Sequence, residues 1–160
     1  MEQKQETIKI DLPLSKQQAV LYKVTVALED IHFDQTAYHV SYVRMLDRAR
    51  GEWLISIGSS NGQMSRESKF LVISQMQIKF VKPALLEQKL TVYTKVHSLT
   101  GTGFVFNQQI KDESDRIICK AEYKMAAVIG KKDKTFAPCR LRTELPKIYT
   151  EVSRVVKSCS

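Results

Sequence analysis

A long helical pattern in the first third of the chain constrains the fold more than any other stretch. From about residue 39 onward, apolar side chains recur at helical spacing and form one stripe, which consists of Tyr42, Leu46, Ala49, Trp53 and Ile57. Val43, Met45 and Leu54 flank this stripe and widen it. We expect such a helix to be enclosed on more than one side and to end at Gly58.

Strand-like patterns surround this predicted helix. Residues 20–28 are rich in β-branched and aromatic side chains, which favours a strand. Further strands are predicted at residues 74–82, 89–97, 104–111 and 116–129, with short turns between them. In the first of these, Met76, Ile78 and Phe80 alternate with polar residues and are expected to form a buried face. One early helix followed by a run of antiparallel strands indicates an α+β fold.

The remaining stretches define the predicted domain organisation. Residues 1–18 are polar and are expected to form a loose N-terminal arm. A main domain is predicted over residues 19–143, and its polar segment 59–69 is expected to be a loop. Residues 144–160 are predicted to form a C-terminal helix and tail, with an apolar stripe that consists of Ile148, Val152 and Val155.

Composition limits the classes of protein to consider. The chain of 160 residues suits one domain with its own core, and 43% apolar and 26% charged residues are ordinary for a globular protein. We expect no transmembrane segment and no signal peptide, so the cytoplasm is the predicted location. Cys119, Cys139 and Cys159 are widely spaced, which predicts reduced thiols and no zinc site.

The formal net charge of +8 is compatible with an anionic partner and equally with a basic surface that only keeps the protein soluble, so charge alone does not decide the function. Nucleic acid, anionic lipid and a polyanionic ligand such as coenzyme A would all be attracted to a basic surface. The sequence has no RNP-type aromatic motif, zinc finger or helix-turn-helix signature, so we expect no nucleic-acid partner.

Four polar or titratable side chains stand just before the long helix or in its first turn. They are His32, Asp34, Tyr38 and His39. In the first turn of a helix, unpaired backbone N–H groups and the helix dipole favour negative charge. This segment is therefore the predicted location of the chemistry.

The residues at the helix start resemble a known family. Residues 38–42 read Tyr-His-Val-Ser-Tyr, residues 46–50 read Leu-Asp-Arg-Ala-Arg and residues 52–54 read Glu-Trp-Leu. Together these strings resemble the hotdog-fold acyl-CoA thioesterases. The closest branch is the 4-hydroxybenzoyl-CoA thioesterase-like one, which includes the thioesterases associated with the Tol–Pal system. The resemblance covers residues from about 18 to about 143.

The resemblance implies both a fold and a reaction. The implied fold is an antiparallel β-sheet wrapped around a long central α-helix, in homodimers or homotetramers with active sites at a subunit interface. The implied reaction is hydrolysis of an acyl-CoA or acyl-carrier-protein thioester by a carboxylate before the helix, while a backbone N–H at the helix start polarises the carbonyl. No metal or cofactor is implied.

The alignment with the family leaves two candidates for the catalytic position. Without a gap, Glu29 and Asp30 match a family Glu-Asp pair, and His32 then occupies the position of the catalytic carboxylate. If the turn is two residues shorter, Asp34 becomes the carboxylate. In the ungapped alignment Asp34 and Gln35 replace a glycine pair. The backbone N–H of His39 is the expected oxyanion donor in both alignments.

Other residues are assigned to substrate binding or to the surface. Tyr38 and Tyr42 are candidates to line an acyl pocket, and the candidates to bind the phosphates of coenzyme A are Arg66, Lys69, Lys82, Lys131 and Lys132. The charged residues of the long helix, which include Asp47, Arg48, Arg50 and Glu52, are expected to form a solvated or interface face.

Two other functions are compatible with the same pattern. The first is a module that binds acyl-CoA or acyl-carrier protein without turnover. The second is a hydratase or dehydratase, which needs an acid and a base on opposite sides of a β-carbon. The sequence leaves the acyl group and the choice between dimer and tetramer open.

Overall fold

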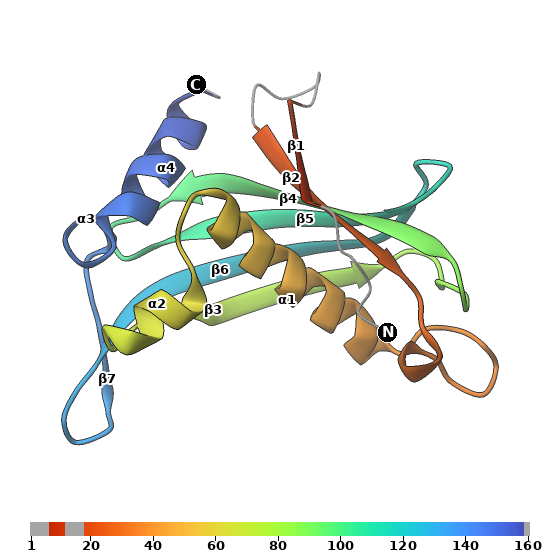
Figure 1. Cartoon of the computed structure of the whole chain (residues 1–160), viewed down its shortest axis with the longest axis horizontal. Coiled ribbons are helices and arrows are strands. Elements are labelled where there is room, and N and C mark those ends of the chain that lie inside the picture. Colours follow the sequence, from red (N-terminus) through yellow and green to blue (C-terminus); the bar gives the residue numbers. More distant parts are fainter. Residues whose placement is uncertain (1–6, 12–17, 159–160) are drawn as a thin grey trace.

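The computed structural model describes residues 7–11 and 18–158, and its centre is a curved antiparallel sheet with α1 lying along one face (Figure 1). The strands are β1 (Thr7–Asp11), β2 (Gln18–Thr25), β3 (Lys69–Phe80), β4 (Lys89–Leu99), β5 (Gly103–Asp112), β6 (Ile117–Gly130) and β7 (Phe136–Pro138). The helices are η1 (Leu28–Asp30), α1 (His39–Ser56), α2 (Asn61–Arg66), α3 (Leu141–Glu144) and α4 (Pro146–Lys157). The α+β prediction, a sheet around a long helix, is confirmed.

The order of the strands places β3 at one edge of the sheet. The sequence of neighbours is β1-β2-β4-β5-β6-β3, every pairing is antiparallel, and β7 pairs with β6. Within the described part of the chain, no strand pairs with the outer edge of β3. An edge strand presents unpaired backbone groups that can accept another strand.

The core forms between α1 and the inner face of the sheet. The predicted stripe is buried, since Tyr42, Leu46, Ala49 and Trp53 are each at most 4% exposed. The Trp53 ring packs at 5.8 Å from the Phe104 ring and 5.0 Å from the Phe106 ring. Gly58 follows the helix with φ +72°, a left-handed conformation that suits glycine at a helix end.

Several predicted boundaries and loops were wrong. The strand predicted at residues 20–28 ends at Thr25 in β2, and Leu28 begins η1. Residues 7–11, expected in a loose arm, form β1 and pair with β2. The predicted loop 59–69 contains α2, because Ser60 caps a helical turn by accepting the Gln63 N–H at 3.1 Å. The short elements β7 and α3 were not predicted.

The predicted buried face of β3 is half open to solvent. The strand begins at Lys69, five residues earlier than predicted, and Met76 and Phe80 are 54% and 50% exposed. These side chains do face the side of α1, because the Phe80 ring lies 5.5 Å from the Tyr42 ring. Because β3 is the edge strand, α1 covers its side chains only in part.

The C-terminal helix predicted within residues 144–160 is present as α4. In α4 the side chains of Ile148 and Val152 are 1% and 0% exposed and belong to the same hydrophobic core as α1. The domain limits at residues 19 and 143 stay a prediction. None of the described helices is long and apolar enough to cross a membrane.

One residue of the predicted charged helix face is buried. Arg50 is 4% exposed, and its guanidinium donates to the Gln108 side-chain oxygen of β5 at 2.8 Å. It also donates to Asp47 at 3.0 Å, where the carboxylate is 73% exposed as expected. The assignment of Arg50 to a solvated face was therefore wrong.

Candidate functional site

A small hairpin-like loop leads into α1. Ile31 forms an antiparallel bridge with Ala37, and the His32 N–H donates to the Thr36 carbonyl at 2.9 Å. The Gln35 N–H closes the turn by donating to the His32 carbonyl at 3.0 Å. Gln35 has φ +65°, a left-handed conformation that is unfavourable for any residue with a Cβ atom. The loop therefore adopts a glycine-type turn without glycine.

Asp34 lies at the exposed tip of this loop and holds the turn together. Its Oδ1 accepts the Thr36 hydroxyl at 2.7 Å and the Thr36 N–H at 3.0 Å. These bonds, the hydroxyl bond first, hold the pKa of the Asp34 carboxyl below its ordinary value. An aspartate whose side chain accepts the backbone N–H of the residue two positions later is common in turns.

His32 lies closer to the helix than Asp34 does. Its ring lies 3.6 Å from the Tyr38 ring, centroid to centroid, with 47° between the ring planes. Tyr38 is the residue immediately before α1. The imidazole of His32 thus belongs to the surroundings of the helix start, while the Asp34 carboxylate faces its own turn.

The first turn of α1 has no side-chain cap. Tyr38 occupies the N-cap position, and no side chain accepts a hydrogen bond there. The amides of His39 and Val40 have no acceptor within a helix at these positions, so they are available to an oxygen of a bound molecule. The Asp30 carbonyl fixes the chain entry, because it accepts the Tyr38 N–H at 2.8 Å and the Ser41 hydroxyl at 3.0 Å.

A cleft of about 290 Å³ opens beside this first turn. Its lining residues come from the loop, from α1 and from the end of β3, and they are Ala37, His39, Tyr42, Phe80, Val81, Lys82 and Pro83. Tyr42 is fixed by the Ala84 N–H, which donates to its hydroxyl at 2.7 Å, and burial raises the pKa of this phenol. The cleft thus combines apolar walls, helix amides and one cation.

The structure brings together some of the predicted site residues and separates others. His39, Tyr42 and Lys82 line the cleft, and His32 and Tyr38 lie in the adjoining loop. Arg66 ends α2 and Lys69 begins β3, and Figure 1 shows α2 near the C-terminal end of α1, away from the cleft at its first turn. Lys69 there forms ion pairs with Glu67 at 3.3 Å and with Glu144 at 3.7 Å.

Exposed apolar side chains at the cleft and around the adjoining loop, which we call the apolar rim, were not among the predicted site residues. Phe80, Val81 and Leu85 are 50%, 44% and 51% exposed, and Phe33 at the loop tip is fully exposed. The available signal was the apolar Phe33 within a polar turn, and the apolar pair directly before Lys82. Such a rim suits contact with an acyl chain or with another protein surface.

The described residues offer neither a metal cluster nor an activated thiol. No group of three or more His, Cys, Asp or Glu side chains in residues 7–11 and 18–158 could hold a metal ion. Burial raises the pKa of the Cys119 thiol to about 11, so this cysteine is a poor nucleophile at neutral pH.

Known proteins match both the sequence and the fold. The sequence profile of the Thioesterase superfamily matches residues 34–119, which is more than half of the chain. The chain belongs to the thioesterase superfamily. The acyl-CoA thioester hydrolase YbgC of Escherichia coli O6:H1 is 31% identical to this thioesterase over 67% of the chain and 80% of its own length. The acyl-CoA thioesterase YbgC of Haemophilus influenzae is 28% identical over 69% of the chain and 82% of its own length.

The fold comparison agrees with the family. The DHNA-CoA thioesterase of Staphylococcus aureus superposes with a TM-score of 0.77 at 17% identity, covering 86% of this thioesterase and 90% of its own chain. The predicted resemblance, the hotdog fold and the assignment as a thioester hydrolase are confirmed. The roles of the individual site residues stay predictions.

Proposed function

We propose that this thioesterase hydrolyses acyl-CoA thioesters to a carboxylic acid and coenzyme A. The observation that carries the proposal is the cleft beside the uncapped first turn of α1. A thioester carbonyl in this cleft would direct its oxygen at the His39 amide, where the helix dipole stabilises negative charge. An acyl-carrier-protein thioester presents the same reacting group and is the alternative form of the substrate.

His32 is the better candidate for the general base. In the proposed step it takes a proton from water, whose oxygen attacks the thioester carbon, and the carbonyl oxygen becomes negative against the His39 amide. The C–S bond then breaks, and the thiolate leaves with the proton from the imidazolium. Asp34 is less suitable, because Thr36 holds its carboxylate and lowers its pKa.

The walls of the cleft fit the two ends of such a substrate. Tyr42 and Phe80 offer aromatic surface to the acyl group, and Tyr38 packs against His32 directly before α1. Lys82 is the cation of the cleft and is suited to the negative charge of coenzyme A.

The open edge of β3 suggests how two copies assemble. Val72, Ile73 and Met76 are 40%, 44% and 54% exposed along this edge. A second copy can add its own β3 antiparallel to the first, which continues the sheet and covers these side chains. We therefore propose a homodimer, or a homotetramer built from such dimers.

Antiparallel pairing of two β3 strands explains the remaining site residues. The twofold axis would place the start of one β3 opposite the end of the other. Lys69 begins β3 and Arg66 ends the preceding helix, whereas Phe80 ends β3 at the cleft. In the dimer Arg66 and Lys69 of one copy therefore approach the cleft of the other, where they can bind phosphates of coenzyme A.

The proposed reaction needs no metal and no cofactor, because a positioned base and oxyanion stabilisation suffice for a reactive thioester. We assign the enzyme to the cytoplasm, where acyl-CoA would be its substrate, and we expect no nucleic-acid partner. These assignments rest on the chemistry of the substrate and on the lack of a nucleic-acid motif.

Release of free thiol from a panel of acyl-CoA esters tests the proposal. We expect turnover by the wild type, a loss of about 100-fold or more in His32→Ala, and most of the turnover in Asp34→Ala. The matched pair of variants also decides between the two alignments, because loss only in Asp34→Ala would identify the carboxylate as the catalytic group.

Two other results would contradict the assignment. Turnover that survives both changes would place the chemistry elsewhere. A ligand-induced rise in melting temperature without thiol release from any ester would indicate a binding module. Turnover of enoyl or 3-hydroxyacyl thioesters without thiol release would indicate a hydratase or dehydratase.

A further inference from the structure

The sheet face opposite α1 carries lysine side chains on five neighbouring strands. In β4, Thr91 alternates with the buried Leu90 and Val92, so it points away from the core. Its direct cross-strand partners are Lys23 of β2 and Lys111 of β5. Cross-strand partners share a face of the sheet, and both lysines therefore lie on this outer face.

The strand register extends this row across the sheet. Gln109 lies opposite Tyr93 on one side and Lys120 on the other, and Lys120 lies opposite Lys79 of β3. The complete set, which we name the lysine face, consists of Lys23, Lys79, Lys89, Lys95, Lys111, Lys120 and Lys124. Five of the seven are exposed, and Lys95 and Lys111 are partly buried.

In the described chain, these seven lysines share the face and its rim with three acidic residues, Glu113, Asp115 and Glu122. Within the paired parts of these five strands, Glu122 is the one acidic residue of the described chain that shares it. At its rim Asp115 forms an ion pair with Lys111 at 3.0 Å. Lys120 and Lys79 stand directly opposite each other, an arrangement that destabilises a sheet. The fold thus tolerates a repulsion that an anionic partner would relieve.

The chemistry of the face favours a diffuse anionic surface as this partner. Lysine is a mobile point charge without the bidentate geometry of arginine, and it is depleted in protein–protein interfaces. A single strand of nucleic acid requires aromatic rings for stacking, but Lys111 covers the Tyr93 ring at 4.9 Å. Charges spread over five strands match a two-dimensional layer of lipid phosphates better than a linear chain.

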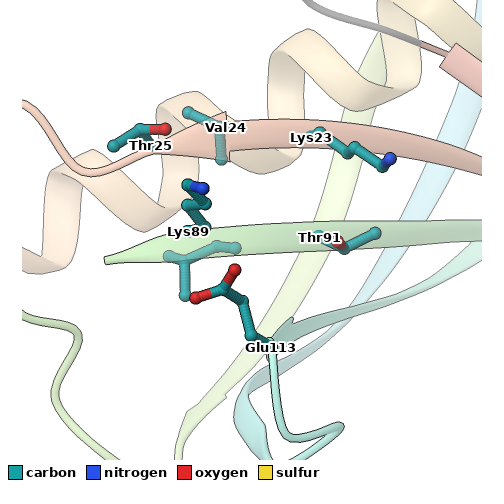
Figure 2. Close-up of a pocket in the computed structure, with 7 residues that line it drawn as sticks. Lys23, Val24, Thr25, Lys89, Thr91 and Glu113 are labelled. Carbon is teal, nitrogen blue, oxygen red and sulfur yellow. The ribbon is translucent and has the colours of Figure 1, made fainter. Parts of the chain in front are cut away.

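A hollow lies at the end of the lysine face near the loop that leads into α1. It has a volume of about 700 Å³ and is lined by the end of β2, the start of β4 and Glu113. Figure 2 shows Lys23, Thr25, Lys89 and Thr91 along these two strands, and Glu113 reaching in from the β5–β6 turn. Ammonium and hydroxyl groups here can bind a headgroup phosphate.

We propose that the lysine face docks the enzyme on membranes of anionic phospholipid. Each lysine near such a surface strengthens binding about fivefold. If two copies pair through β3, their sheets become continuous and both lysine faces lie on the same side, so a dimer presents twice the charge to one membrane. This last step rests on the proposed dimer, whereas the docking of a single copy does not.

Sedimentation of the full chain with lipid vesicles tests the proposal. We expect binding to vesicles of phosphatidylcholine with about one quarter phosphatidylglycerol, none to phosphatidylcholine alone, and release when salt rises from about 0.1 M to about 0.5 M. The double variant Lys120→Gln with Lys124→Gln should bind about 25-fold more weakly.

A charge-matched control separates the face from net charge. Lys132→Gln with Lys134→Gln removes the same charge from the loop between β6 and β7 and should change binding by no more than about twofold. Equal loss in both double variants, or equal binding to the two lipid compositions, would overturn the proposal. Binding of RNA or of an acidic protein without binding of vesicles would overturn it as well and would assign the face to that partner. Circular dichroism confirms the fold of each variant.

Discussion

Arg50 is a buried charge at the contact between the central helix and the sheet. Its guanidinium lies 3.7 Å from the centre of the Tyr123 ring and donates to Gln108 at 2.8 Å. Gln108 in turn donates to the Leu46 carbonyl at 3.0 Å and to the Thr94 hydroxyl at 2.9 Å. A buried charge is costly without partners, so Gln108 is the residue that makes Arg50 tolerable in the core.

Removal of Gln108 should therefore destabilise the protein strongly. We expect Gln108→Leu to lower the free energy of unfolding by about 3 kcal/mol, because it leaves the buried guanidinium without its inward acceptor. Asp47→Asn removes the negative charge beside Arg50, but this carboxylate is 73% exposed, and the expected loss is at most about 1 kcal/mol. Urea unfolding of both variants measures the difference, and equal losses would contradict this account.

At the scale of single residues, sequence reasoning succeeded where local chain geometry decides the position. His39 and Tyr42 follow from helical spacing, and both line the cleft. The burial of Arg50 was not predictable in this way, because its main partner Gln108 is 58 residues away in the sequence. The proposed preference for His32 over Asp34 also depends on the fold, since the Thr36 contacts of Asp34 arise from the turn.

Among the elements, β3 differs most from its sequence pattern. Alternation predicted correctly which of its side chains face the helix side, and the contact of Phe80 with Tyr42 agrees. The alternation of apolar and polar residues predicts only the direction of each side chain. Whether a side chain of β3 is buried depends on what lies beyond the edge of the sheet. In the proposed dimer, a second copy would cover Met76, which is 54% exposed here despite its apolar pattern.

Lysines on the edge of β3 should abolish the proposed dimer. Lysine on an exposed edge strand opposes pairing, so Ile73→Lys with Met76→Lys should halve the mass measured by light scattering, to the 18.3 kDa of one chain. KM for acyl-CoA should rise in parallel, because Arg66 and Lys69 no longer reach the cleft of a second copy. Ile55→Lys is a suitable control, since Ile55 is a similarly exposed apolar residue on α1. A dimer that persists in the double variant would exclude pairing through β3.

Three turns of the molecule share one feature, an aspartate that accepts hydrogen bonds from backbone N–H groups. Thr36 holds Asp34 and Thr135 holds Asp133, in each case with the hydroxyl bond as the main reason why the pKa is lowered. Burial acts to raise the pKa of Asp112, but bonds from Arg116 and Ser114 outweigh it and lower the pKa. A carboxyl whose pKa is lower in the folded state stabilises the fold above its ordinary value of 3.8 and loses this effect as the pH falls.

Acid should therefore weaken these turns. We expect the melting temperature to fall as the pH decreases from about 5 to about 3, in the range where the three aspartates take up protons. Asp112→Asn should melt at a lower temperature than the wild type near neutral pH and should show a flatter decline in acid. Thermal melts monitored by circular dichroism across this range compare the two proteins, and parallel declines would argue against a contribution of Asp112.

On the scale of the whole molecule, most long elements were predictable and most short ones were not. The helix α1 and strands β4, β5 and β6 have apolar periodicity over ten or more residues, which fixes their type. The elements β1, β7 and α3 have five residues or fewer, which is too short for apolar periodicity to fix their type, even though β1 and β7 pair with the adjacent strands β2 and β6. The C-terminal helix was predicted as a separate segment, yet its apolar stripe packs into the common core.

If α4 is part of that core, a cavity created beside α4 should also lower the stability of α1. We expect Ile148→Ala to lower the free energy of unfolding by about 3 kcal/mol, because Ile148 is 1% exposed and its truncation leaves a cavity. Trp53 is the single tryptophan of the chain and lies in α1, so its fluorescence reports the unfolding of the central helix. The fluorescence midpoint in urea should therefore shift as far as the midpoint measured by circular dichroism.

Val155→Ala, at a half-buried position of the same helix, should cost about 1 kcal/mol. A tryptophan transition that stays in place while some helical signal melts early would show that residues 144–160 unfold as a separate unit.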